Sequence, residues 1–135
     1  MKKWILPPLA LASTACMPAE PIEMTAAEQG EFSKAVTDRV AGSPLNCVSS
    51  RSLRGNRSFG EGVILFEGHG GTVYVNRPAA GCPELGLGRS LVTRSSGTQL
   101  CQGDIAEVVD LSSGVGFGGC ALGEFVPYRR ARYRL

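Results

Sequence analysis

The sequence predicts a mainly β fold, namely a small disulfide-stapled antiparallel sheet or partly closed barrel, preceded by one N-terminal helix. Three observations support this prediction. Short β-prone runs alternate with Gly-rich segments after residue 44, four cysteines lie in that region, and one earlier stretch has helical periodicity. The 18 Gly and 8 Pro among 135 residues favour turns and short strands over long helices.

An amphipathic helix is predicted within residues 25–43, over 26–41. Thr25 and Glu28 have the spacing of a capping box, in which each side chain satisfies a backbone N–H of the first turn. Apolar residues then recur at i, i+3, i+4 and i+8, on one face of a helix, as Phe32, Ala35, Val36 and Val40. Pro44 marks the end of this segment.

A β-rich domain is predicted over residues 44–128. Its candidate strands are rich in β-branched and apolar residues, and they cover Leu45–Ser50, Gly62–Glu67, Thr72–Asn76, Arg89–Thr93, Ile105–Asp110 and Val115–Cys120. Residues 68–71 (GHGG) join the second and third strands as a hairpin turn, because Gly accepts the positive φ that tight turns require. The continuously apolar run Val63–Phe66 is expected to be the most buried strand.

The first 15 residues have the features of a signal peptide. Basic Lys2 and Lys3 precede a short apolar stretch, and small residues lead up to Cys16. Ser13-Thr14-Ala15-Cys16 resembles a lipobox, which predicts lipidation of Cys16 and a tether over 16–24. The next residue, Met17, is not the Asp that commonly retains lipoproteins at the inner membrane, which favours an outer-membrane location facing the periplasm. Ser13 stands where lipoboxes usually have an aliphatic residue, so ordinary cleavage to a soluble periplasmic protein is the alternative.

Cysteine parity also favours lipidation. Setting Cys16 aside leaves an even number, which suits two disulfides in an oxidising compartment; these four are Cys47, Cys82, Cys101 and Cys120. No C-x-x-C motif supports a zinc or thioredoxin-type site. Three pairings are possible, and the favoured one is Cys47–Cys120 with Cys82–Cys101, on the expectation that the first and last strands pair.

No catalytic residue, metal site or cofactor is predicted. His69, the only His, lies in the Gly-rich turn, and Asp104 is expected to satisfy backbone N–H groups of a turn. The segment 114–119 (GVGFGG) matches G-x-G-x-x-G, but a dinucleotide site needs a helix directly after it. A β-turn or bulge is the expected structure there.

A basic segment predicts contact with anions. Arg51, Arg54 and Arg57 are interspersed with Gly55 and Asn56, which favours a mobile loop from which the arginines contact phosphate or carboxylate groups. A further basic tail is predicted over 129–135. The 14 Lys and Arg and 12 Asp and Glu nevertheless balance once Lys2 and Lys3 are removed, so a nucleic-acid partner is not expected.

Several pieces of the chain resemble a known protein family. They are CVSSRSLRG (47–55), VYVNRP (73–78), GCPEL (81–85), LCQGD (100–104) and CALGEFVPY (120–128). Together they resemble an uncharacterised family of small exported, cysteine-containing proteobacterial (sphingomonad-type) proteins. The resemblance implies export and a domain held together by disulfides, and it implies no activity.

These features together predict a non-enzymatic cell-envelope lipoprotein whose small β domain binds or braces another envelope component. The expected partners are the membrane, through the lipid anchor, and an envelope protein or anionic envelope component. The alternative is a soluble periplasmic enzyme or enzyme inhibitor.

Overall fold

The structure is a computed structural model that describes residues 15–16, 22–95 and 97–131. The predicted signal peptide up to residue 14, the tether residues 17–21 and the tail residues 132–135 lie outside the described residues. Along the chain, the helices and strands are α1 (Ala26–Ala35), β1 (Arg39–Ala41), β2 (Cys47–Ser49), η1 (Ser50–Ser52), β3 (Leu53–Phe59), β4 (Val63–Gly68), η2 (His69–Gly71), β5 (Val73–Asn76), β6 (Ser90–Thr93), β7 (Gln99–Cys101), β8 (Ile105–Val109), β9 (Gly116–Ala121) and β10 (Phe125–Arg130). The predicted mainly β fold with one N-terminal helix is confirmed.

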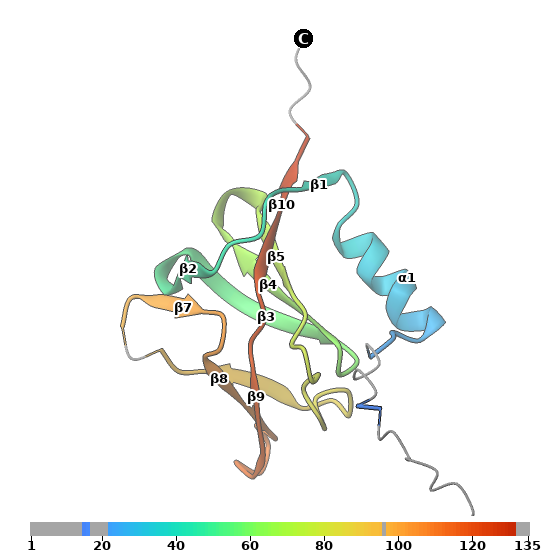
Figure 1. The fold of residues 1–135 in the computed structure, drawn as a ribbon, viewed down its shortest axis with the longest axis vertical. Coiled ribbons are helices and arrows are strands. Elements are labelled where there is room, and N and C mark those ends of the chain that lie inside the picture. Colours follow the sequence, from blue (N-terminus) through green and yellow to red (C-terminus); the bar gives the residue numbers. More distant parts are fainter. Residues whose placement is uncertain (1–14, 17–21, 96, 132–135) are drawn as a thin grey trace, which may run out of the picture.

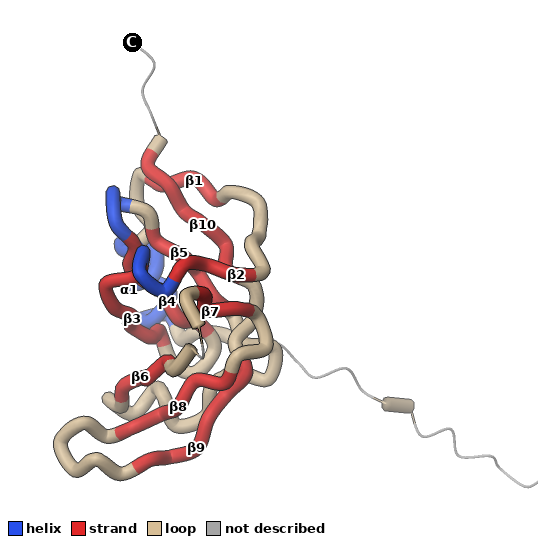
Figure 2. The backbone as a smooth tube through the Cα atoms, turned by 90° about the vertical axis from the view of Figure 1, so that its left-hand side faces the viewer, coloured by secondary structure: helices blue, strands red, loops and turns tan. Residues whose placement is uncertain are grey.

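The strands of the described residues form three antiparallel sheets. The largest has the order β1-β10-β5-β4-β3, while β6-β8-β9 form a three-stranded sheet and β2-β7 a two-stranded one. Figures 1 and 2 both place β8 and β9 at the end of the molecule opposite β1. All six predicted strands are present, with ends within two residues of the prediction.

Two apolar clusters cover the two faces of the large sheet. Phe32 of α1 packs edge-on against Phe59, with ring centroids 5.6 Å apart, in one cluster. Phe66 and Phe125 meet in the other cluster, together with residues from the smaller sheets. All four residues of Val63–Phe66 are buried because β4 lies between the two clusters, which confirms this run as a buried strand.

The helix is shorter than predicted. Its capping box is present, since the Thr25 hydroxyl accepts from the Glu28 N–H and the Glu28 carboxylate accepts from the Thr25 N–H. The helix ends at Ala35, however, and Asp38 turns the chain with a φ of 61°. Val40, expected on the helix face, instead lies in β1 and is 63% exposed. Pairing of β1 with β10 outweighs the helical periodicity at this position.

Strand pairing also changes the predicted ends of the β-rich domain. β1 adds residues 39–41, which were assigned to the helix, and β10 continues to Arg130. The basic tail therefore begins inside a strand, where Arg129 pairs with Val40 and Arg130 with Arg39. The turn η2 joins β4 to β5 as predicted, with φ of 69° at Gly70 and 77° at Gly71.

Candidate functional site

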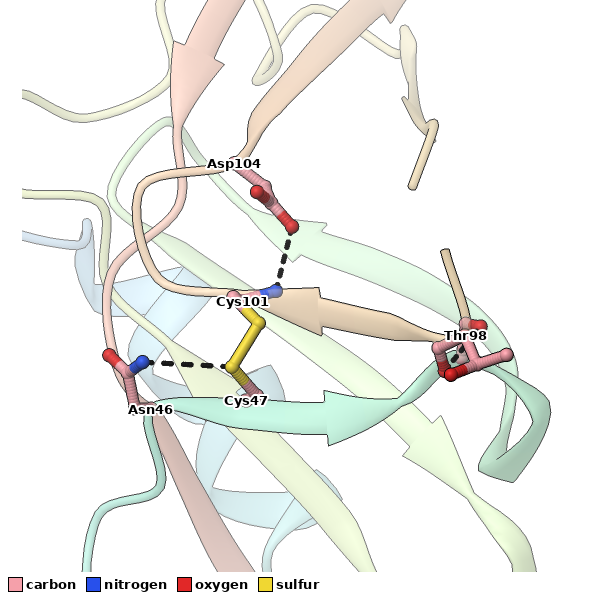
Figure 3. The surroundings of a disulfide bond; sticks show 6 residues. Asn46, Cys47, Thr98, Cys101 and Asp104 are labelled. Atoms are coloured by element: carbon pink, nitrogen blue, oxygen red, sulfur yellow. Dashed lines mark hydrogen bonds between the residues drawn. A yellow bond between two sulfur atoms is a disulfide. The ribbon is translucent and has the colours of Figure 1, made fainter. Parts of the chain in front are cut away.

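The four cysteines of the β domain form two disulfides, but not in the favoured pairing. Cys47 bonds to Cys101, and Cys82 bonds to Cys120. The favoured pairing was wrong because β2, the expected partner of the last strands, pairs with β7 instead. That register places Cys47 directly opposite Cys101, as Figure 3 shows. Cys120 then points from β9 into the buried core, where it meets Cys82.

Hydrogen bonds around the Cys47–Cys101 disulfide stabilise the ends of the β2–β7 strand pair. The Asp104 carboxylate accepts a hydrogen bond from the Cys101 N–H at 2.8 Å, which closes the turn between β7 and β8 (Figure 3). The Ser50 N–H and hydroxyl both donate to the Thr98 carbonyl, at 2.9 Å each, at the other end of the strand pair. Asp104 therefore has the turn role expected from its sequence context.

A depression with a basic rim lies between the C-terminal end of α1 and the strands β3, β4 and β5. We call it the basic depression. It has a volume of about 420 Å³, and its charged lining residues are Lys34, Arg39, Arg54, Arg57 and Glu67. Positive groups in a shared concave surface reinforce one another's attraction for anions. The arrangement can therefore bind phosphate or carboxylate groups.

Arg54 and Arg57 reach the basic depression from a strand, not from the predicted mobile loop. Both lie in β3, where residues three apart would normally point to opposite faces. A register shift between Leu53 and Gly55 leaves Arg54 as an extra residue, so that it borders the same depression as Arg57. Arg51 lies in η1 and does not line the depression.

Arg39 and Lys34 also line the basic depression, and the sequence did not predict a role for either residue. Arg39 is positioned by two hydrogen bonds, from Nε to the Gly71 carbonyl at 3.0 Å and from a terminal guanidinium nitrogen to the Ala35 carbonyl at 2.8 Å. Lys34 is exposed and forms an ion pair with Glu31 at 3.1 Å. Both residues were placed in a continuous helix, and only the early end of α1 brings Arg39 over the sheet.

The cations of the basic depression are only partly neutralised. Nε of Arg57 lies 3.7 Å from a Glu67 carboxylate oxygen, a long contact between two half-exposed side chains. Nε of Arg54 donates to Nδ1 of His69 at 3.0 Å, and this partner carries no carboxylate. The contact assigns His69 a part in orienting Arg54, which the sequence did not indicate. Arg54 thus keeps the remaining guanidinium N–H groups free for a ligand.

The segment 114–119 forms the end of a hairpin and not a nucleotide-binding loop. It leads from the turn after β8 into β9, and no helix follows it directly. The Ser112 hydroxyl and N–H donate to the Asp110 carboxylate at 2.6 Å and 2.9 Å, and these hydrogen bonds lower the pKa of that carboxyl. Asp110 therefore stabilises the turn.

A larger depression lies elsewhere on the domain. It has a volume of about 490 Å³ and a mainly apolar lining that includes Val75, Arg77, Ala121, Glu124 and Val126. Its two charged groups have opposite signs, so it has no net electrostatic preference for an anion. The basic depression, though smaller, has the stronger chemical specificity, and it is the candidate functional site.

The described part of the chain contains no cluster of three or more His, Cys, Asp or Glu residues arranged to hold a metal ion. It also contains no helix long and apolar enough to cross a membrane. The two disulfides fit an exported protein in an oxidising compartment. No protein-family model, curated protein or solved structure matches this chain.

Proposed function

We propose that this chain is a non-enzymatic cell-envelope lipoprotein, anchored through Cys16, whose β domain binds an anionic envelope component. The observation that carries the proposal is the basic depression, in which Lys34, Arg39, Arg54 and Arg57 converge from α1, β1 and β3. Guanidinium groups bind carboxylates and phosphates through paired, planar hydrogen bonds. Arg39, held by two backbone carbonyls, gives the site one cation of fixed position.

The position of Cys16 supports the anchor. Cys16 is exposed and lies six residues before Ile22, where the described chain joins the domain. The other four cysteines pair with one another, so the disulfides leave only Cys16 unpaired. A lone thiol is unusual in an oxidising compartment, whereas a lipidated cysteine has no thiol to oxidise.

Lipidation at Cys16 predicts a distinct mass for the membrane form. The protein purified from membranes should begin at Cys16 and carry added acyl mass. It should stay with the membrane, because several acyl chains bind a membrane far more firmly than one. Intact-mass spectrometry measures this directly. Cys16→Ala serves as the control and should release the protein into the soluble periplasmic fraction. Soluble wild-type protein with an unmodified Cys16 would instead support the periplasmic alternative.

If the basic depression binds anions, replacing Arg54 and Arg57 should weaken that binding. In the unlipidated Cys16→Ala protein, Arg54→Ala/Arg57→Ala should weaken binding to isolated cell wall and to anionic vesicles about fivefold at low salt, since each exposed charge contact contributes about 0.5 kcal/mol. High salt should weaken wild-type binding in the same way, because these contacts are exposed to solvent. Co-sedimentation at two salt concentrations measures both effects.

The matched control is Arg51→Ala/Arg94→Ala. It also removes two exposed arginines, but neither lines the basic depression. Equal loss in both double variants would show that net charge, and not the depression, determines binding. Retained binding in Arg54→Ala/Arg57→Ala with a normal melting temperature would refute the proposed site and favour the alternative of an enzyme or inhibitor.

A further inference from the structure

The N-terminal segment joins the domain at one end of β4. Ile22 packs on the turn between β3 and β4, where a Cβ on Gly62 would lie 2.8 Å from the Ile22 carbonyl oxygen. The Ile22 side chain also contacts Gly81 closely enough that a side chain there would clash. We call this end of the domain, with Ile22, Gly62 and Gly81, the tethered pole.

The basic depression lies toward the opposite end of the same strand. β4 runs from Val63, next to the tethered pole, to Gly68, which lines the depression. The five residue steps from Val63 to Gly68 span about 17 Å at 3.3 Å per residue. In Figure 1, α1 runs upward and ends near β1.

The tethered pole carries exposed apolar side chains. Ile22 is 43% exposed and Leu87 is 70% exposed. Leu87 lies on the same pole, because the preceding Gly86 packs against Gly60 of the β3–β4 turn. Apolar side chains beside a lipid anchor favour contact with the membrane interface. The six Cα-to-Cα steps from Cys16 to Ile22 reach at most about 22 Å, which keeps this pole near the bilayer.

We infer that the anchored protein rests its tethered pole on the bilayer and presents the basic depression away from it, toward carboxylate groups of the cell wall. The inference rests on the proposed function and names the partner of the same site. A separation of about 17 Å exceeds the Debye length of about 8 Å at physiological salt. Headgroups of the anchoring bilayer are then largely screened from Arg54, which lies beside the Gly68 end of β4, whereas a polymer facing that bilayer can reach it. Arg57 lies nearer the tethered pole, because it pairs with Leu65.

Orientation can be tested with single tryptophans, because the only Trp of the chain is Trp4, which precedes Cys16. Lipidated Leu87→Trp and Val40→Trp proteins are reconstituted in phosphatidylcholine vesicles with brominated acyl chains. Leu87→Trp should be quenched and Val40→Trp, in β1 beside Arg39, should not. Quenching of both or of Val40→Trp alone overturns the inference. Proteins that fail to bind the vesicles overturn the lipid anchor, and the inference with it.

Partner choice is tested with the same vesicle-bound protein. Isolated cell wall should bind the vesicles through the protein, and chemical amidation of the wall carboxylates should abolish this binding. Arg54→Ala/Arg57→Ala should reduce it about fivefold, as for the free protein. Unchanged binding after amidation, or added phosphatidylglycerol in the vesicles competing with the wall, overturns the inference. In the latter case the basic depression still binds anions, so the proposed function survives.

Discussion

Removing the Cys82–Cys120 disulfide is expected to lower the free energy of unfolding by more than about 4 kcal/mol, the value that the loop of 38 residues contributes through loop entropy alone. The change is Cys82→Ala/Cys120→Ala, measured by urea denaturation under non-reducing conditions. The loss should exceed the loop term alone, because both cysteines belong to the apolar core and alanine leaves their sulfur volume unfilled. Adding reductant to the wild-type protein should produce a similar destabilisation or a larger one.

The Cys47–Cys101 pair is the control for this prediction. It closes a loop of 54 residues, for which loop entropy alone also predicts about 4 kcal/mol. Both of its cysteines are only partly buried and join two strands of three residues each. Cys47→Ala/Cys101→Ala should therefore destabilise the protein less than Cys82→Ala/Cys120→Ala. An equal or reversed order would show that core packing around Cys82 contributes little.

Asn76→Asp is expected to lower the free energy of unfolding by about 3 kcal/mol at pH 7, because it places a carboxylate among buried groups. Asn76 is fully buried in β5. Its Nδ2 donates to the Gly123 carbonyl and its Oδ1 accepts from the Gly123 N–H, both at 2.8 Å. A charged aspartate keeps the second hydrogen bond but loses the first and repels the Gly123 carbonyl.

The pH dependence of this variant distinguishes its mechanism from a simple loss of packing. When the carboxyl introduced by Asn76→Asp is protonated, it can donate to the Gly123 carbonyl and accept from the Gly123 N–H, as the amide of Asn76 does. Burial raises the pKa of such a carboxyl in the folded state, so the variant should approach wild-type stability below about pH 3.9, the ordinary pKa of an aspartate side chain. Its stability relative to wild type should fall as pH rises above that value.

The control for Asn76→Asp is Asn76→Ala, which removes both hydrogen bonds at every pH. Its destabilisation of about 2–3 kcal/mol should not vary with pH between about 3 and 8 beyond the variation of the wild type. Urea denaturation across this pH range measures both variants. Parallel curves for the two variants would contradict the carboxyl mechanism.

Local signals were sufficient for much of the β-rich fold. The hairpin of β4 and β5 follows from an apolar run, a Gly-rich turn and an alternating strand, all of which are close in sequence. The capping box of α1 is likewise a contact between Thr25 and Glu28, three residues apart. Interactions of this kind depend on backbone geometry over a few residues, so their pattern is visible in the sequence.

Pairing between strands far apart in the sequence explains why the predicted disulfide pairing and the predicted end of the helix were wrong. The disulfide pairing depends on which strand lies beside β2, and the partner is β7, about fifty residues away. The helix end depends on the competition between further helical turns and the ladder of β1 with β10, which joins residues about ninety apart. Neither competitor leaves a local signal, because a strand's partner is determined by how all the sheets pack together.

Sequence patterns alone were sufficient to predict the mainly β class, the position of most strands, the buried run Val63–Phe66 and the presence of two disulfides. The candidate site, in contrast, became visible only in the folded protein. A bulge at Arg54 aligns it with Arg57, the early end of α1 brings Arg39 over the sheet, and Arg51 is left outside. A binding surface is assembled from side chains of several elements, and the relative positions of these elements follow from packing and strand register, not from spacing along the chain.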